Sequence, residues 1–417
     1  MKEMKKDQEK TIMILGANTL QVPLIESAKK LGYITVVVSP VSSEVGHSIC
    51  DHSELIDIRD EEKLLGIARK YNINGVITDQ TDIAVRSVAF VAENMGLPGI
   101  GYETACLFTD KYRMREKCRE LGIPTLKYKM VRNLDDAQRF LIELGGEAIL
   151  KPVDNQGSKG VSFIDSPQKM AECYIEAMSY SKQKEVLIEQ VAKGREFVVE
   201  GIVFNGVFKN LIVGDTYYFD IPDVFSATRR VFPTNASNEL RTKVEDINKR
   251  IIEGFGLKQG ITHSEFIMNG DDVILIETAA RGGGVYISSD LINICTGLET
   301  EKFLLGIATG SQEKMPKFNT DLKACCYLAF FLPVGTVEKT DGIERVSQLP
   351  YIHHNNLSDI FVGMETKEPK DKTSRFFMIV EGKDRVELDE RVDAIICLLN
   401  GIKVRGADGC LHSPIWR

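Results

Sequence analysis

Two glutamates in one predicted β-hairpin have the type and spacing of a cation site. In HSEFIMNGDDVILIETAARGGG, apolar strands at 263–268 and 273–278 flank NGDD, a strong hairpin signal. If the loop is residues 270–272, Glu265 and Glu277 stand opposite each other, with β-carbons roughly 5 Å apart. Facing carboxylates repel unless a cation bridges them, and oxygen ligands suit Mg²⁺ better than zinc. The alternative is a solvated face with two independent glutamates.

A polar loop in LKPVDNQGSKGVSF has the composition of a phosphate-binding flap. A predicted strand ends at Lys151. Within the polar stretch after it, Gly157 and Gly160 lie on either side of Ser158 and Lys159. Lysine side chains and loop amides both bind phosphate oxygens. The segment lacks the GxxxxGK[ST] pattern, which excludes a P-loop NTPase. A surface Lys-Pro turn is the alternative.

The elements that must position these residues begin with alternating strands and helices. Continuous apolar runs followed by helical segments predict a parallel sheet covered on both faces. The strands are expected at 11–18, 33–39 and 75–79, and the helices at 20–30, 60–72 and 82–95. We place the end of this first domain near residue 105.

Two turns of this domain could contact a ligand. ILGAN (Ile14–Asn18) lacks the second and third glycines of a dinucleotide fingerprint, so a plain strand-to-helix turn is preferred. TDQTD (Thr78–Asp82) follows a strand's carboxyl end, where open sheets bind ligands. Helix capping by Asp79 or Asp82 explains the same residues equally well.

A smaller α+β unit follows residue 106. Helices are expected at 109–122, with Lys111 near the start, at 134–144 and at 167–180, around strands AILKPV and VSFI. The apolar strand VLIEQV then places Glu189 beside Gln190, and Glu196 opens the strand EFVVEGIVF.

The composition limits the classes of function. The hydrophobic fraction of 43% and charged fraction of 27% in 417 residues are those of a multidomain globular protein. A net charge of −8 argues against nucleic-acid or anionic-membrane partners, because both need a basic surface. No apolar run approaches the roughly 20 residues of a membrane span, and MKEMKKDQEK lacks a signal peptide's apolar core. Nine scattered cysteines indicate reduced thiols and a cytoplasmic protein.

These motifs, in this order, resemble the ATP-grasp enzymes over roughly residues 1–310. The resemblance implies a Rossmann-like N-terminal domain and two α+β lobes that clamp ATP, with Mg²⁺ or Mn²⁺. Family roles pass to matching positions: Lys111 and Lys151 bind phosphates; Gln156, Gly157, Ser158, Lys159 and Gly160 form the flap; Glu189, Gln190 and Val191 read adenine; Glu196 holds the ribose; Glu265 and Glu277 bind the metal.

One departure from the family's usual pattern indicates which branch of the ATP-grasp enzymes this sequence resembles. Many ATP-grasp enzymes carry Glu-x-Asn at the second metal ligand, whereas Ala279 stands two residues after Glu277 here. ETAARGGG is more similar to the amino-acid ligases, which join a carboxylate to an amine through an acyl phosphate and release ADP. That similarity implies small-molecule carboxylate and amine substrates. The residues that it implies for substrate contact or catalysis are His263, Arg281, Gly282 and Gly283, with Lys151 assisting. A buried structural role explains His263 equally well.

Two further segments carry weaker expectations. FSATRRVFP (Phe225–Pro233) is read as a basic insertion whose Arg229 or Arg230 could meet a phosphate or carboxylate, with a solvated loop preferred. Residues beyond 310 are read as a small α+β lobe without chemistry of its own, in which His353 and His354 lack metal-type partners.

The expected organisation has four parts: a Rossmann-like domain at 1–105, an ATP-grasp small lobe at 106–186, a large lobe with the metal site at 187–312, and a C-terminal α+β lobe at 313–417. Family members are commonly homodimers, and the sequence leaves the oligomeric state open. Two other functions remain. A biotin-carboxylase-like, carbamoyl-phosphate-synthase-like or purine-pathway enzyme would activate bicarbonate or formate, and a non-catalytic regulator would bind ATP without turnover.

Overall fold

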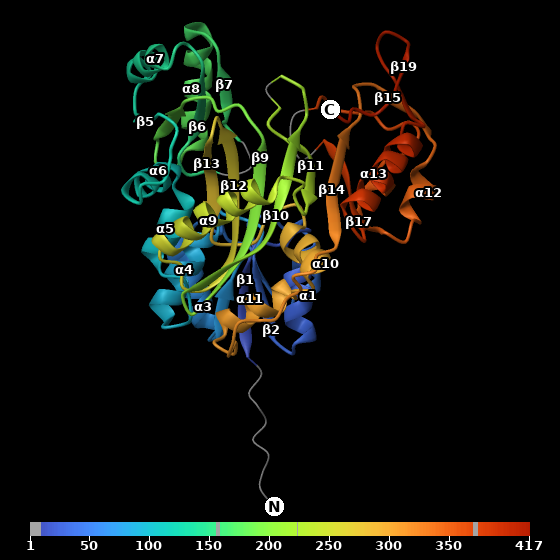
Figure 1. Ribbon diagram of the computed structural model, residues 1–417. Helices are drawn as coiled ribbons and strands as arrows, with labels where there is room; N and C mark the ends of the chain where they lie inside the picture. The colour runs from blue at the N-terminus through green and yellow to red at the C-terminus, as the bar shows by residue number, and fades with distance from the viewer. Residues whose placement is uncertain (1–9, 156–158, 223, 370–373) are drawn as a thin grey trace, which may run out of the picture.

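The computed structural model describes residues 10–155, 159–222, 224–369 and 374–417, which form four sheets with covering helices (Figure 1). Mixed α/β architecture was expected and is confirmed. Among the described residues, no helix is both long and apolar enough to cross a membrane.

The N-terminal sheet is parallel, as predicted, with the strand order β3-β2-β1-β4. Its strands are β1 (Thr11–Leu15), β2 (Ile34–Val38), β3 (His52–Glu54) and β4 (Gly75–Ile77). Its helices are α1 (Val22–Lys30), α2 (Gly46–Ile49), α3 (Glu61–Tyr71) and α4 (Val85–Met95). The sequence did not predict α2 or β3, which are only four and three residues long.

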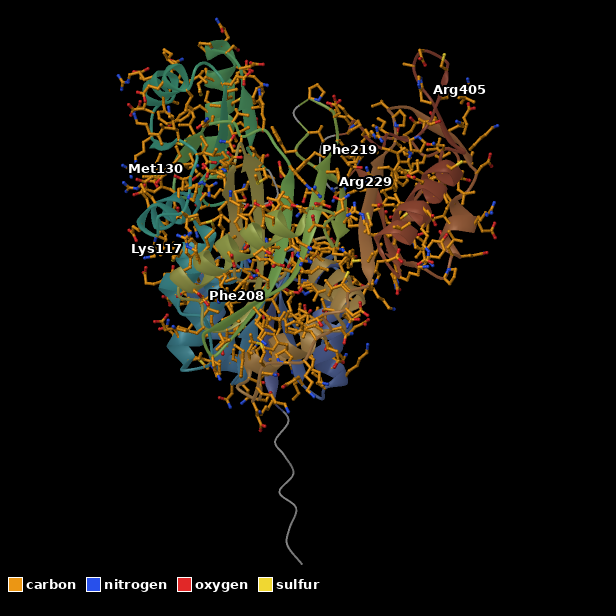
Figure 2. The ribbon with its side chains drawn as sticks, viewed as in Figure 1. Lys117, Met130, Phe208, Phe219, Arg229 and Arg405 are labelled. Atoms are coloured by element: carbon orange, nitrogen blue, oxygen red, sulfur yellow. The ribbon has the colours of Figure 1, made fainter. Side chains whose placement is uncertain are left out.

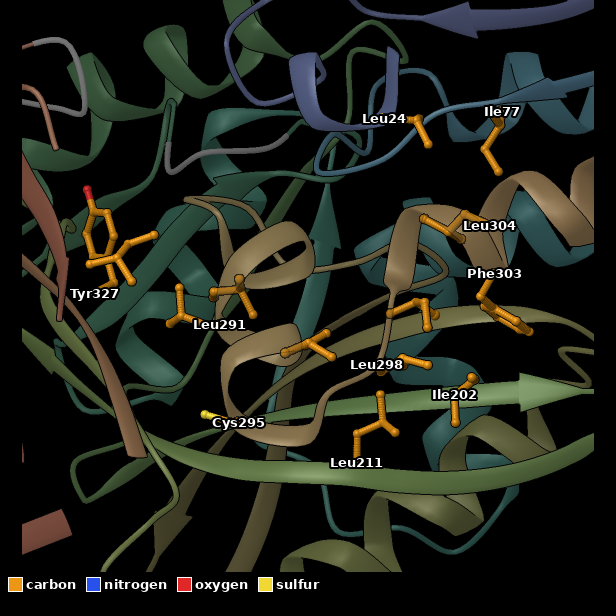
Figure 3. Packing of buried hydrophobic residues seen from close by; sticks show 14 of the residues in the cluster. Leu24, Ile77, Ile202, Leu211, Leu291, Cys295, Leu298, Phe303, Leu304 and Tyr327 are labelled. Carbon is orange, nitrogen blue, oxygen red and sulfur yellow. The ribbon is translucent and has the colours of Figure 1, made fainter. Parts of the chain in front are cut away.

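Alternation along β1 explains how both faces of this sheet are buried. Met13 and Leu15 pack on α3 and α4, whereas Ile12 and Ile14 point the other way. On that second face the cover comes from α1 and from α11 (Thr300–Ala308), a helix far along the chain (Figure 3). The N-terminal domain therefore shares its core with the later part of the chain.

The small lobe is an antiparallel sheet of order β5-β8-β6-β7, reached through α5 (Tyr102–Thr109) and α6 (Lys111–Glu120). Its strands are β5 (Tyr128–Val131), β6 (Ala148–Pro152), β7 (Ser162–Ile164) and β8 (Val186–Glu189). Two helices, α7 (Leu134–Glu143) and α8 (Pro167–Tyr180), cover one face through the apolar residues of one core cluster.

The largest sheet has eight strands in the order β13-β12-β9-β10-β11-β14-β17-β16. These are β9 (Glu196–Phe204), β10 (Val207–Tyr218), β11 (Ala227–Phe232), β12 (Gly260–Asn269), β13 (Asp272–Ala279), β14 (Ala324–Phe331), β16 (Ile352–Asn355) and β17 (Arg375–Gly382). Other elements are α9 (Asn238–Gly254), η1 (Ile287–Leu291), α10 (Ile292–Thr296), α12 (Ile343–Ser347), η2 (Leu357–Asp359), α13 (Arg385–Leu399), and a small sheet of β15 (Thr336–Thr340), β18 (Ile402–Arg405) and β19 (Leu411–His412). Because β14, β16 and β17 extend the sheet of β9–β13, hydrogen bonding continues across residue 312. The four-part division remains a prediction.

The β12–β13 hairpin brings the two predicted metal ligands together by a different route from the one expected. The turn has two residues, with Asn269 opposite Asp272, so the predicted three-residue loop is wrong. A bulge at Ile276 then shifts the register by one residue, which restores the pairing of Glu265 with Glu277.

Two readings of loop and surface segments are also wrong. Residues 227–232 form the interior strand β11, whose neighbours are β10 and β14, rather than a solvated loop. Arg229 lies on this strand (Figure 2), and its guanidinium stacks over the ring of Tyr217. His353 and His354 do have acidic partners, since each lies 2.9 Å from a carboxylate, on Glu381 and Asp290.

Candidate active site

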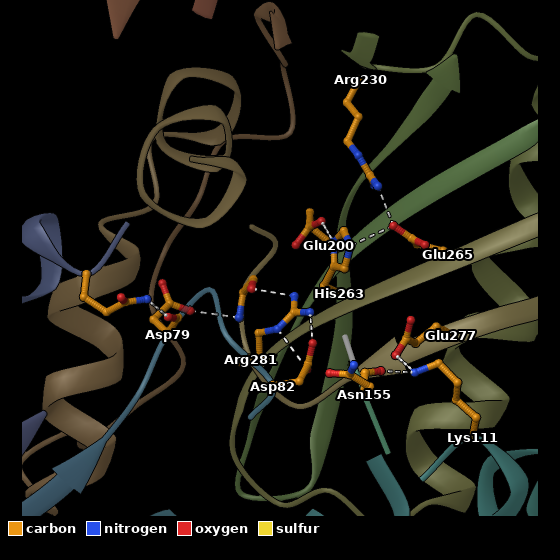
Figure 4. Close-up of polar contacts among 12 residues, drawn as sticks. Asp79, Asp82, Lys111, Asn155, Glu200, Arg230, His263, Glu265, Glu277 and Arg281 are labelled. Carbon is orange, nitrogen blue, oxygen red and sulfur yellow. Dashed lines mark hydrogen bonds and ion pairs between the residues drawn. The ribbon is translucent and has the colours of Figure 1, made fainter. Parts of the chain in front are cut away.

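Glu265 and Glu277 face each other across the hairpin, and each binds a basic side chain through Oε1 (Figure 4). Lys111 Nζ donates to Glu277 at 2.8 Å, and Arg230 Nη2 donates to Glu265 at 2.5 Å. Burial alone raises the pKa of Glu265, but Arg230 and His263 outweigh it and hold that pKa well below its usual range. Glu265 is therefore held in its ionised form, and each of the two carboxylates is anchored by a basic side chain.

This pair has the donor set of a divalent-cation site. Among the described residues, Oε2 of Glu265 and Oε2 of Glu277 accept no hydrogen bond, so one oxygen of each carboxylate is left for a ligand. The described chain forms no cluster of three or more acidic, histidine or cysteine side chains that could hold a metal. A cation here would complete its shell with water and phosphate oxygens, which Mg²⁺ commonly does.

Lys111 reaches this pair because α6 begins where it does. Asp110 caps the helix by accepting from Arg113 N at 3.0 Å, which makes Lys111 its first residue. Lys111 Nζ also donates to the carbonyl oxygen of Asn155, 2.7 Å away and just before the predicted flap. Flap residues Gln156, Gly157 and Ser158 lie outside the described residues. Their neighbours are an exposed Lys159 and a buried Gly160 at φ +74°.

Lys151 lies in a buried ion triad instead. Its ammonium pairs with Glu189, which also accepts from Arg115 Nε at 2.6 Å. Arg115 is 1% exposed, and its Nη2 donates to the carbonyl oxygen of Ile276 at 2.6 Å. The Glu189 side chain is thereby fully engaged, so an adenine contact here would fall to the main chain of Gln190 and Val191.

The predicted ribose carboxylate sits at the start of β9. Glu196 accepts from Tyr218 Oη at 2.8 Å, and burial raises its pKa to about 7.

Gln190 N donates to Lys127 O at 2.8 Å, which ties the end of β8 to the chain before β5.

Arg281 lies at the other end of the site, held by the N-terminal domain. Its Nε donates to Asp82 Oδ1 at 3.0 Å, its Nη2 contacts Asp82 Oδ2, and its Nη1 donates to Gly282 O at 2.8 Å (Figure 4). Gly282 N donates to Asp79 Oδ1 at 2.9 Å. Neither aspartate caps α4, whose N-cap is Ala84, so the capping interpretation is wrong.

His263 shares the Glu265 face, as expected. Its Nδ1 is 2.5 Å from Glu200 Oε1 and its Nε2 is 3.4 Å from Glu265 Oε1. Burial lowers the pKa of His263, but the two carboxylates outweigh burial and raise it. Arg230, which the sequence offered together with Arg229 as a partner for a phosphate or carboxylate, binds a protein carboxylate, that of Glu265. Buried Glu200 was not singled out from the sequence, although the alternation of EFVVEGIVF, with Glu196 and Glu200 on one face, was available as a signal.

Comparison with known proteins identifies the domain that contains most of these residues. Residues 145–290 match the model of the ATP-grasp domain. This part of the chain is an ATP-grasp domain. The chain is 26% identical over 270 residues to alanine–anticapsin ligase of Bacillus subtilis (strain 168), covering 59% of this chain and 56% of that ligase. It is 25% identical over 182 residues to formate-dependent phosphoribosylglycinamide formyltransferase of Wolinella succinogenes, covering 43% of this chain and 47% of that enzyme.

A solved structure extends the likeness in fold. The L-amino acid ligase from Bacillus licheniformis superposes with a TM-score of 0.77 at 20% identity, over 94% of this chain and 98% of that one. The two curated relatives named above are matched over 56% and 47% of their own length, which is less than two thirds.

Proposed function

We propose that this ATP-grasp protein is an ATP-dependent carboxylate–amine ligase, acting on an amino acid and releasing ADP and phosphate. The observation that carries the proposal is the facing pair of Glu265 and Glu277, bracketed by Lys111 and Arg230. This arrangement presents charge of both signs where a triphosphate and a metal would meet. The likeness to alanine–anticapsin ligase supports an amino acid as the carboxylate substrate.

In the first step the substrate carboxylate attacks the γ-phosphorus of ATP, which forms an acyl phosphate and releases ADP. A divalent cation on Glu265 and Glu277, most simply Mg²⁺, would neutralise phosphate charge. Lys111 and Arg230 lie on either side of that pair, 2.8 and 2.5 Å from its oxygens. Both side chains can stabilise the phosphoryl group as its charge redistributes, with the flap assisting. Lys151 would assist only on leaving its pair with Glu189.

In the second step the amine nitrogen attacks the acyl carbon, the bond to phosphate breaks, and the nitrogen loses a proton. Arg281 uses three of the five N–H groups of a guanidinium on Asp82 and Gly282. Within the described chain the amides of Gly283 and Gly284 donate no hydrogen bond. The remaining N–H groups of Arg281 and these two amides can donate to the oxyanion that develops on the carbonyl oxygen.

The test is ADP release measured over a panel of amino acids and small carboxylates with several amines. We expect ADP release to require an amino acid, and Glu277→Gln to abolish it while the circular dichroism spectrum is unchanged. Glu381→Gln is the control, because Glu381 lies on β17 and pairs with Lys323 and His353. Normal turnover by Glu277→Gln with Mg²⁺ would remove the metal assignment.

Activation of formate or bicarbonate is the second candidate. It is favoured by the likeness to formate-dependent phosphoribosylglycinamide formyltransferase. Ala279, where many such enzymes carry asparagine, favours the amino-acid ligase instead. ADP release that depends on formate or bicarbonate alone would select this candidate, and tight ATP binding without any turnover would indicate a regulator.

A further inference from the structure

The N-terminal sheet has a crevice at its carboxyl edge of the kind that binds ligands in open α/β sheets. Strands β1 and β4 are neighbours, and the helices that follow them cover opposite faces: α1 packs with Ile12 and Ile14, and α4 packs with Met13 and Leu15. Where the connections diverge in this way, the loops after the two strands leave a gap between them.

A loop of the ATP-grasp domain fills this gap. Residues 281–286 are bound by three side chains from the segment that follows β4. Asp82 pairs with the Arg281 guanidinium, Asp79 accepts from Gly282 N, and Gln80 Oε1 accepts from Tyr286 N at 3.0 Å. Each of the three acts on a different part of the loop.

The β1 side of the crevice holds those binding side chains in turn. Gln21 Nε2 donates to Asp79 O at 2.8 Å, and Gln80 Nε2 donates to Leu20 O at 2.9 Å. Gln21 and Asp79 are fully buried, so these contacts satisfy polar groups that water does not reach.

The loop adopts a conformation that needs this support. Val285 and Tyr286 have φ of +54° and +63°, a region that is unfavourable for a β-branched or bulky residue. Such residues persist only where the surroundings hold them. The fit is also tight, because a Cβ on Gly282 would lie 2.9 Å from Asp79 Oδ1 and one on Gly283 would lie 2.8 Å from His263 Nδ1.

We propose that the N-terminal domain uses this ligand crevice as a socket for loop 281–286, with Asp79, Gln80 and Asp82 as positioning residues for Arg281. Asp82 engages the Nε–Nη2 edge of the guanidinium and thereby fixes its plane. One N–H on each terminal nitrogen is not used in these contacts, so a ligand could accept from it. The identity of the group that Arg281 binds rests on the proposed function, whereas the socket itself does not.

A double-mutant cycle tests the positioning role. We expect Asp82→Asn to lower kcat/KM for the carboxylate substrate about 10- to 100-fold, as losses of orienting partners do. The affinity for ATP, measured directly by titration, should change less than about twofold. In an Arg281→Ala background, Asp82→Asn should add less than about a twofold effect, because it acts through Arg281. If the two losses multiply instead, Asp82 does not act through Arg281 and the positioning role is refuted.

Amide hydrogen exchange tests the socket without any turnover. Gln80→Ala should accelerate exchange at Tyr286, and Asp79→Ala should accelerate it at Gly282, about tenfold or more each, with exchange in β1 unchanged. Asp60→Ala is the control, since Asp60 caps α3 and does not touch the loop. Unchanged exchange at both amides would overturn the socket. A chain with the expected exchange but no ADP release with any carboxylate would refute the proposed function and leave the socket standing.

Discussion

Replacing Glu189 by glutamine measures how strongly the small lobe depends on its buried ion triad. Glu189 is 2% exposed, and its carboxylate is shared by Arg115 and Lys151, which are 1% and 7% exposed. Glutamine has nearly the same shape without the charge. The change therefore leaves two buried cations facing a neutral amide.

The magnitude follows from burial. Removing one partner of a buried ion pair destabilises a protein by about 3–5 kcal/mol, because the remaining charge stays desolvated. Glu185→Gln is a matched control: Glu185 also lies 2.6 Å from an arginine, but that residue, Arg132, is 68% exposed. Pairs with so much exposure contribute about 0–1 kcal/mol.

The assay is urea unfolding followed by circular dichroism, together with amide exchange in β6 and β8. Burial raises the pKa of Glu189, but Arg115 and Lys151 outweigh burial and hold it at about 2, against a usual value of 4.5. A depressed acid pKa contributes stability that is complete above about pH 4.5 and is lost as the pH falls toward 2. Glutamine should abolish this dependence. Equal destabilisation by Glu189→Gln and Glu185→Gln, within about 1 kcal/mol, would refute the reasoning.

Three further changes give separate predictions. Burial raises the pKa of Asp79 from 3.8 to about 6, so the wild type should lose about 3 kcal/mol of stability as the pH rises from 4 to 6. Asp79→Asn keeps the acceptor for Gly282 and should remove that loss of stability. Urea midpoints that change with pH by the same amount in both proteins would contradict this. Arg230→Met should lower kcat about 100- to 1000-fold in the ADP-release assay with little change in ATP affinity, since it removes a charge beside the phosphoryl group; a change in affinity alone would assign Arg230 to ground-state binding. Gly160→Ala should destabilise the small lobe by about 1–3 kcal/mol in urea, because Gly160 has φ +74° and its Cβ would lie 2.8 Å from Tyr180 Cδ2; an unchanged midpoint would show that the chain relaxes there.

Local patterns in the sequence were enough for most elements. Continuous apolar runs and 3.6-residue periods predicted the parallel N-terminal sheet and helix α8, whose bounds match the expected 167–180. The carboxylate pair was also predicted, because NGDD between two apolar strands specifies a hairpin. The predicted register assumed a three-residue turn, which is wrong. The bulge at Ile276 shifts the register by one residue and so restores the predicted pairing.

Contacts between residues far apart in the chain could be decided only by the tertiary structure. The partners of Arg281 and Glu265 are Asp82 and Arg230, 199 and 35 positions away, and no periodic pattern links such positions. Arg230 was read as part of a polar loop because its neighbours are polar, yet in the fold it lies on an interior strand. A sequence thus determines which segments can form strands and helices, since periodicity and turn residues act over a few positions. Which charges meet inside is set by how those segments pack, because a buried ion is stable only beside the partner that packing provides.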